Sequence, residues 1–562
     1  MRLAREIGII GALVTFAISP STNLDPINLP KFVVLFVGAG YLLSNFKLIV
    51  NRYKSGTKSY KVFILTVISF VIFQFLGLFL SGESLTTQIF GVFGRNTGFL
   101  TYLALSILLL FASTLESLIQ VREAVKYFVF VMLFELFYGY IQLANLDPFD
   151  WKNQYNRVIG TLGNPNFSSA MFGIAASALV PFVFQRSTRI RMRIGICFAF
   201  IAFASLTIFT RSWQGTALIL FSLSLYLLVF LRTHQKTKQL SYVLLATYPA
   251  FMVLSYLGFQ GQGPLGEILK KPTFAIRVDY WRAAIKMIYD HPFFGVGADH
   301  FGNWFRLVRD EETVNRIGQN VSTNSSHNLI LDIMANTGLI SGLLYLVMIS
   351  LILLKSTLRL WNIKSLDNKL YLSVLIGWLA YQIQSLISIN QIGVGVWGWI
   401  ATGLMAAMVL NENNFSIEMA SDGKGKKISE GKSKKSSELL DSSRPLFSRL
   451  IITPIFILIA VVPLIADAKV ITALKQGNID KLYTAVTSYP SDPSRLAFAT
   501  QAFAQNKLPE YSLKTARYAV TSFPNDYVSW QLLSQVANSE AEYKKALANM
   551  KRLDPLFDAK GK

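Results

Sequence analysis

Cysteine is nearly absent from this chain of 562 residues, and charged residues and histidines are scarce. The one cysteine, Cys197, lies in an apolar run, so the sequence excludes a disulfide framework and a metal site built on cysteines. Charged residues make up only 15% of the chain. Three of the 4 histidines fall within one stretch, residues 258–327, which is therefore the first place to look for chemistry.

Apolar residues, by contrast, are abundant. Hydrophobic residues make up 52% of the chain and aromatic residues 13%, enough to fill many bilayer-spanning helices of about 20 apolar residues each. We therefore expect an all-α, polytopic membrane protein surrounded by membrane lipids. The formal net charge of +22 comes from Lys and Arg that lie mainly in short loops between apolar runs, where they orient the protein and meet anionic lipid. Nucleic acid is not an expected partner.

The apolar runs predict thirteen spans, of which twelve form a core and the last is an addition. The predicted spans lie near residues 6–20, 32–50, 62–81, 98–114, 125–144, 166–185, 194–210, 214–231, 240–257, 328–354, 370–389, 393–410 and 448–466. The corresponding domains are a transmembrane domain at 1–410, a linker at 411–447, an additional span at 448–466 and a tail at 467–562.

Alternate connections between the predicted spans are basic. Their basic residues are Arg2, Arg5, Arg52, Lys54, Lys58, Lys61, Arg189, Arg191, Arg193, Arg232, Lys236, Lys238, Lys355, Arg359 and Lys364, followed by the Lys-rich stretch 424–435. By the positive-inside rule these connections are cytoplasmic. The large loop 258–327, between the ninth and tenth spans, therefore lies outside the cytoplasm.

The linker and the tail have their own patterns. The linker is rich in Ser, Gly and Lys without hydrophobic periodicity, so we expect a disordered cytoplasmic tether. In the tail, Ala-Val-Thr-Ser-Tyr-Pro at 485–490 recurs as Ala-Val-Thr-Ser-Phe-Pro at 519–524, a spacing of 34 residues. Such a period closed by proline is typical of tetratricopeptide helix pairs. This extracytoplasmic array is either a plain helical cap or a surface for a protein partner, and the sequence leaves both open.

Four arginines lie on the outer side, against the charge rule. They are Arg95, Arg157, Arg211 and Arg277. Any one of them can be explained by a side chain that snorkels to the lipid headgroups. Guanidinium groups stay charged, however, and present a planar fork of donors that matches phosphate oxygens. Four of them near one membrane surface therefore indicate an anionic lipid substrate that carries a diphosphate.

Within the outer loop, apolar residues recur at helical spacing over residues 275–290. They are Ile276, Tyr280, Trp281, Ala284, Ile285 and Ile288. We expect an amphipathic helix that lies on the membrane or on the bundle and stops at Pro292, Gly295 and Gly297. Its aromatic residues are interpreted as packing rather than as a sugar platform. The Gly-Val-Gly turn follows no strand and so is not a nucleotide-binding fingerprint.

His327 is the strongest single candidate for a catalytic residue. Ser325 or Ser326 can cap the helix that begins the tenth span, which places His327 in its first turn. There the positive end of the helix disfavours the imidazolium, and a neutral imidazole can accept a proton from a sugar hydroxyl as a general base. The alternative is a structural hydrogen bond at the start of the helix.

Other chemistries are disfavoured. A metal site formed by His291, His300 and His327 would have irregular spacing and Asp299 as its one obvious carboxylate partner. The outer loops hold no pair of carboxylates at the spacing that marks a glycosidase. No metal and no organic cofactor is expected.

Several short motifs together resemble the O-antigen ligase and polymerase superfamily. They are Gly-Thr-Leu-Gly-Asn-Pro-Asn at 160–166, Thr210-Arg211-Ser212, Arg277 with Trp281, residues 292–297 with Phe301, and His327-Asn328 followed by Gly338 and Gly342. The resemblance covers most of residues 60–410. It implies twelve spans with a large periplasmic loop between the ninth and the tenth. The thirteenth span and the tail are additions to that pattern.

The resemblance also implies an activity. The protein would be a glycosyltransferase of the bacterial cytoplasmic (inner) membrane that moves a glycan from undecaprenyl diphosphate to an acceptor hydroxyl, with inversion and without a metal. His327 would activate the acceptor hydroxyl, and Arg211 and Arg277 would hold the diphosphate. Further substrate contacts are expected from Arg95, Arg157, Asn164 and Asn166. The acceptor can be a lipid (ligase), another repeat unit (polymerase) or a protein side chain.

Two functions from other classes stay open. A solute transporter would also have many spans and charged loops, but transporters usually place charged residues at mid-span positions, which we expect to be lacking here. A scaffold for envelope assembly would explain the repeat tail but leaves the outer arginines without a role.

Overall fold

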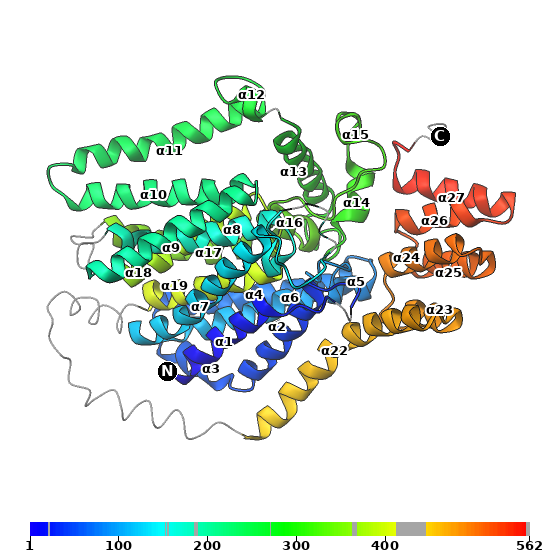
Figure 1. Ribbon diagram of the computed structural model, residues 1–562, viewed down its shortest axis with the longest axis horizontal. Coiled ribbons are helices and arrows are strands. Elements are labelled where there is room, and N and C mark those ends of the chain that lie inside the picture. Colours follow the sequence, from blue (N-terminus) through cyan, green and yellow to red (C-terminus); the bar gives the residue numbers. More distant parts are fainter. Residues whose placement is uncertain are drawn as a thin grey trace.

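Helices form all the regular structure in the part of the chain that the computed structural model describes (Figure 1). The described residues are 1–20, 23–151, 153, 155, 157–184, 189–269, 271–361, 368–411 and 446–557. Most helices form one bundle, the outer-loop helices cover one end of it, and the C-terminal helices form an array at that same end. The expected all-α, polytopic fold is confirmed.

A helix occupies each predicted span. In chain order these are α1 (Arg2–Phe16), α2 (Asn28–Leu43) with α3 (Lys47–Ser55), α4 (Lys58–Leu80), α6 (Phe99–Ser113), α7 (Leu118–Leu143), α8 (Pro165–Phe184), α9 (Ile190–Phe209), α10 (Trp213–Thr233), α11 (Lys238–Phe259), α16 (Leu329–Thr337) with α17 (Leu339–Trp361), α18 (Lys369–Ser385), α19 (Ile392–Leu410) and α22 (Leu446–Gln476). Two short elements, α5 (Leu85–Phe90) and the 3-10 helix η1 (Gly160–Leu162), lie in connections. Within the described ranges 9 helices are long and apolar enough to cross a membrane, or 10 if α2 and α3, bent by 63°, form one span. The number thirteen therefore stays a prediction.

The centre of the bundle is α19 and its edge is α11. The apolar span of α19 is 94% buried, whereas that of α11 is only 6% buried. Because lipid tails are as apolar as a protein core, a span can leave apolar side chains on its outer face without cost. The chain passes directly from this exposed helix into the outer loop.

The tenth predicted span, 328–354, is not one helix. It breaks at Gly338, which separates α16 from α17 and has a φ of +91°. A Cβ atom at this glycine would lie 2.0 Å from the backbone oxygen of Phe293, and the Leu339 N–H donates to the oxygen of Pro292 over 2.8 Å. The prediction of a continuous span was wrong because the glycine that permits this close backbone approach lies within an apolar run.

The described part of the outer loop folds into short helices and one long one. They are α12 (Gly266–Leu269), α13 (Pro272–Asp290), α14 (Phe301–Val308) and α15 (Glu311–Ile317). The long helix, α13, is the amphipathic helix expected over 275–290, and it packs on α14, α15 and α16. Ala283, Ala284 and Met287 form its buried face, whereas Ile285 is 58% exposed. Ile285 therefore lies outside the face that packs on the protein, which Met287 completes.

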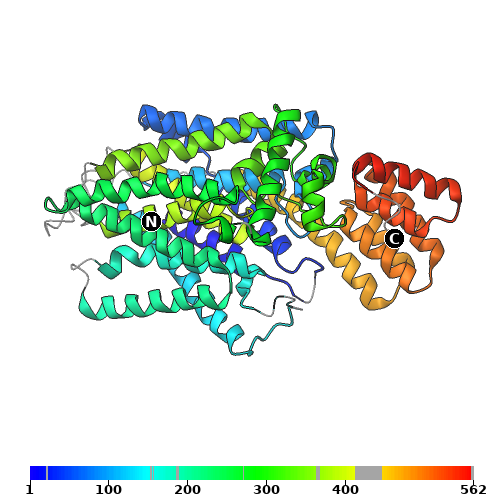
Figure 2. The same ribbon diagram turned by 90° about the horizontal axis from the view of Figure 1, so that it is seen from above.

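The tail forms a helical array beside the outer loop. After α22 come α23 (Ile479–Thr487), α24 (Pro493–Gln505), α25 (Pro509–Ser522), α26 (Tyr527–Val536) and α27 (Glu540–Leu553), and consecutive helices pack on one another. The array lies next to α14 in both views (Figure 1 and Figure 2). Because α22 runs beyond residue 466, where the predicted span ends, the added span continues directly into the array. The tetratricopeptide assignment stays a prediction, and the predicted linker lies outside the described residues except for 411, 446 and 447.

A charged side chain lies buried near the middle of α7, contrary to expectation. Glu135 is 1% exposed, and its carboxylate accepts hydrogen bonds from the hydroxyl and the N–H of Thr161 in η1, the latter at 3.2 Å. Gly160 leaves room for this contact, since a Cβ there would lie 2.6 Å from the carboxylate. These hydrogen bonds hold the motif 160–166 against α7.

Candidate active site

The segment that leads into α16 places His327 just outside the helix. Asn328 is the N-cap: its side-chain oxygen accepts hydrogen bonds from two first-turn N–H groups, both at 3.1 Å. His327 precedes this cap and has a φ of +54°, which costs a non-glycine residue roughly 1–2 kcal/mol. The prediction that Ser325 or Ser326 caps the helix was wrong, because the asparagine reaches the first-turn N–H groups and Ser325 instead accepts from the N–H of His327 over 3.1 Å.

The ring of His327 lies against the ring of Tyr280, with centroids 5.5 Å apart and planes 25° apart. Tyr280 and Arg277 are three residues apart on α13, so one face of this helix presents both. Burial, followed by the positive charges of Arg277 and Arg95, lowers the pKa of His327 from 6.5 to about 4. The imidazole is thus uncharged at neutral pH, as expected, but burial and guanidinium groups cause this rather than the helix end.

Arg277 is half-buried. No carboxylate of the described residues pairs with it, and burial lowers its pKa. A guanidinium group has five N–H donors in a fixed fork and accepts no hydrogen bond. A partly desolvated guanidinium without a carboxylate partner therefore provides a binding position for an anion such as a phosphate.

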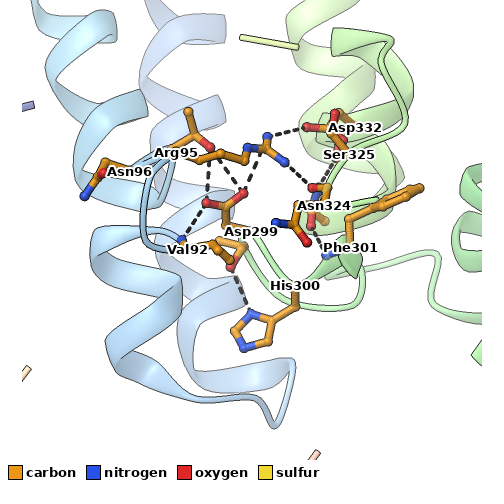
Figure 3. Close-up of polar contacts among 12 residues, drawn as sticks. Val92, Arg95, Asn96, Asp299, His300, Phe301, Asn324, Ser325 and Asp332 are labelled. Carbon is orange, nitrogen blue, oxygen red and sulfur yellow. Dashed lines mark hydrogen bonds and ion pairs between the residues drawn. The ribbon is translucent and has the colours of Figure 1, made fainter. Parts of the chain in front are cut away.

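Arg95 is in a different situation, shown in Figure 3. Its guanidinium pairs with Asp299 at 3.5 Å and with Asp332 at 3.3 Å, and it donates to the backbone oxygen of Asn324. Asp299 also accepts a hydrogen bond from the N–H of Val92 over 2.8 Å. This network ties the α5–α6 connection, the outer loop and α16 together. These contacts position Arg95 within the protein, and its assignment to substrate binding stays a prediction.

Arg211 and Arg157 lie apart from this group. Both side chains are exposed, and within the described residues neither contacts His327 or Arg277. Arg211 stands between α9 and α10 with a φ of +53°. Ser169 of α8 fixes this turn, because its hydroxyl donates to the backbone oxygen of the residue after Arg211 over 3.0 Å. The assignment of Arg211 and Arg157 to the substrate stays a prediction.

Asn164 and Asn166 lie at the start of α8. The side-chain oxygen of Asn164 accepts a hydrogen bond from the N–H of Asn166 over 2.8 Å, and its amide donates to the hydroxyl of Tyr155 over 3.2 Å. Asn164 therefore acts as a cap for the helix. Asn166 is exposed. Contacts of these two residues with a substrate likewise stay a prediction.

The three histidines of the outer loop have separate neighbours. His291 lies edge-on to Trp304, with centroids 4.5 Å apart, and Nδ1 of His300 lies 3.0 Å from the oxygen of Ala298. Among the residues the structure describes, no group of three or more His, Cys, Asp or Glu side chains is placed to hold a metal. Of the three, His327 is the histidine that contacts α13 on the face that carries Arg277.

Some members of the site escaped the sequence patterns. The apolar periodicity of residues 275–290 predicts that Tyr280 packs in the protein and does not mark it as a site residue. Its spacing from Arg277 nevertheless places both residues on one face of a helix. The pairing of Arg95 with Asp299 and Asp332 has no signal in the sequence, because the three residues belong to segments far apart in the chain.

Comparison with known families covers the centre of this site. Residues 166–346 match the family model described as O-antigen ligase. The match extends from α8 into α17 and includes Arg211, Arg277 and His327, whereas Arg95, Arg157 and the tail lie outside it. Among curated proteins the chain has no match. The family match therefore supports a likeness of residues 166–346 to the O-antigen ligase superfamily.

Proposed function

We propose that the protein moves a glycan from undecaprenyl diphosphate to an acceptor hydroxyl on the outer face of the bacterial cytoplasmic membrane. The observation that carries this proposal is the contact of the uncharged His327 with Tyr280, on the helix face that also carries the unpaired Arg277. Transfer from a diphosphate requires a proton acceptor and an anion-binding group in one place. The O-antigen ligase match across this segment supports the same class of reaction.

The proposed reaction is an inverting displacement. The acceptor oxygen attacks the anomeric carbon on the face opposite the diphosphate, so that one C–O bond forms while the bond to the diphosphate oxygen breaks. His327 takes the hydroxyl proton, and undecaprenyl diphosphate leaves with the electron pair. Arg277 stabilises the negative charge that builds on the leaving oxygen. The imidazolium then returns its proton to water.

Donor binding would itself strengthen the base. In the free protein the pKa of His327 is about 4, which makes the imidazole a weak proton acceptor. A diphosphate beside Arg277 brings negative charge close to the ring and offsets the guanidinium groups that help to lower this pKa. The pKa then rises toward neutral pH, where a general base works best. The acceptor is thus activated only when a donor is present.

In this mechanism arginine supplies the positive charge. Arg277 offers a permanent cation with donors that fit phosphate oxygens, so the leaving group needs no metal to neutralise it. We propose that Arg211, at the outer ends of α9 and α10, contacts the diphosphate from the level of the headgroups. Arg157 and the two asparagines at the start of α8 are proposed as peripheral contacts.

We propose that the protein is a ligase. A repeat-unit polymerase and a protein O-oligosaccharyltransferase would use the same chemistry and differ from a ligase in the acceptor. Deletion of the gene, followed by analysis of the lipid-linked glycans, tests this proposal. Accumulation of full-length glycan on undecaprenyl diphosphate supports the ligase, and accumulation of a single repeat unit supports the polymerase. An unchanged pool of lipid-linked glycans would contradict glycan transfer altogether.

A further inference from the structure

A cleft of about 660 Å³ lies between the tail and the outer loop. One wall comes from the α4–α5 connection, the start of α14 and residues 322–324, and the other from α24 and the α25–α26 connection. Contacts elsewhere fix the tail to the body: Asp554 pairs with Arg306 and Arg309, and Asp467 accepts a hydrogen bond from the α1–α2 connection over 2.7 Å. The cleft is therefore a defined space between two fixed walls.

The helix α24 turns one face toward this cleft. Ser494, Phe498 and Gln501 follow one another at helical spacing and all line it, whereas Leu496 and Phe503 point into the core of the array and are buried. Phe498 is 41% exposed. An exposed aromatic ring flanked by a hydroxyl and an amide is suited to a ligand with both apolar and polar faces.

The charged groups in the walls are already engaged. Asp299 pairs with Arg95, and Asp526 accepts a hydrogen bond from the first turn of α26 over 2.7 Å. Arg306 pairs with Asp554 at 3.4 Å and is the one Lys or Arg side chain among the described lining residues. The walls therefore offer no uncompensated cation, and the cleft does not suit the diphosphate donor.

The side chains that remain available are neutral. Asn303 and Gln501 line the cleft, and neither amide group forms a hydrogen bond with a described residue. We propose that the cleft binds the saccharide part of the acceptor, and that this part is an uncharged oligosaccharide. Amides offer both donors and acceptors to sugar hydroxyls, the C–H face of a sugar ring packs on an aromatic ring such as Phe498, and the volume lies within the range of about 300–1,000 Å³ typical of small-molecule sites.

Residues that line the cleft lie only a few positions before His327, the proposed base, in the sequence. Ser322 and Asn324 line the cleft, and His327 follows three residues after Asn324. Arg95 holds Asn324 by its backbone oxygen (Figure 3). This contact fixes the start of the segment that runs from the cleft to His327. This inference rests on the proposed transferase function and names the acceptor of the same site.

Transfer kinetics of the purified full-length protein in nanodiscs test the cleft. The donor is the lipid-linked glycan extracted from the deletion strain, and the acceptor is the envelope extract of that strain. Phe498→Ala and Gln501→Ala should each raise the acceptor KM roughly two- to tenfold, as expected for one lost contact, without changing the donor KM. Tyr543→Ala is the matched control, because Tyr543 is 45% exposed on α27 and lies outside the cleft.

The outcomes separate this inference from the proposed function. An unchanged acceptor KM in both cleft variants, with normal wild-type transfer, overturns the cleft and leaves the transferase standing. Absence of transfer by the wild-type protein overturns both. The acceptor extract is also treated with periodate or with protease before the assay. Loss of acceptor activity after periodate supports a saccharide, and loss after protease makes the occupant a protein and overturns the assignment.

Discussion

Asp554 in the tail pairs with Arg309 of the outer loop over 2.5 Å, and both side chains are fully buried. Gln319 of the loop extends this contact, since its amide donates to the backbone oxygen of Leu556 over 3.0 Å. Breaking a buried ion pair on one side is costly because it leaves a charge without a partner. The tail is therefore fixed to the loop 258–327 rather than loosely tethered.

Asp554→Asn should release the tail from the outer loop. We expect docking to weaken by about 3–5 kcal/mol, measured as faster amide hydrogen exchange in α14 and α27. Glu542→Gln provides the control, because Glu542 pairs with the exposed Arg517 within the tail and its loss should cost under about 1 kcal/mol. Equal exchange rates in the two variants would show that the pair with Arg309 does not hold the tail.

Gly338→Ala should destabilise the junction of α16 and α17. Gly338 and Gly82 both have a positive φ, so alanine at either position adds backbone strain of about 1–3 kcal/mol. Only at Gly338 does the new Cβ also meet a backbone oxygen at 2.0 Å, whereas nothing lies within 4 Å at Gly82. The melting temperature in detergent should therefore fall much further for Gly338→Ala than for Gly82→Ala. Equal melting temperatures would contradict the close approach.

The pKa of His327 predicts how stability depends on pH. Folding lowers this pKa from 6.5 to about 4, so between these values the unfolded chain binds a proton that the folded protein lacks. Stability is then complete above pH 6.5 and falls as the pH drops toward 4. The melting temperature of the wild type should fall more steeply across this window than that of His327→Gln, whose amide does not titrate. Parallel curves would refute the lowered pKa.

The positions of the helices could be predicted because a segment that crosses the membrane needs about 20 apolar residues and must form all its backbone hydrogen bonds internally, as a helix does. The spans predicted at 62–81 and 125–144, for example, lie within α4 and α7 to within a few residues. Hydropathy does not report the backbone break at Gly338, since its neighbours remain apolar. Hydropathy also does not show that α22 continues past residue 466. It marks where the apolar residues end, whereas the helical backbone can continue beyond the membrane.

The site could be predicted only in part. The sequence indicates that His327 is uncharged, because it places the residue in the first turn of a helix, but the structure attributes this to burial and guanidinium charge. The outer location of Arg95 suggests substrate binding, whereas its pairing with Asp299 and Asp332 depends on contacts between distant segments. Composition and spacing carry no information on such pairings.

The membrane orientation can be checked with single cysteines in a Cys197→Ser background. Cysteines at Asn320 and Lys545, both exposed, should react with a membrane-impermeant thiol reagent in intact spheroplasts, because the positive-inside rule predicts that the loop and the tail lie outside the cytoplasm. A cysteine at the exposed Lys54 should react only after permeabilisation. Reaction at Lys54 with protection at Asn320 would invert the topology and remove the site from the outer face.

The central claim is that His327 accepts the acceptor's proton while Arg277 holds the diphosphate, and transfer by purified variants tests it most directly. His327→Ala should lower the rate of transfer about 10²- to 10⁴-fold while the lipid-linked donor still binds. Arg277→Lys keeps the charge but loses the planar fork, so both donor binding and transfer should fall. Lys286→Gln removes an exposed cation from the same helix and should behave like the wild type. With all variants at wild-type levels in the membrane, near-normal transfer by His327→Ala or by Arg277→Lys would contradict the role of that residue.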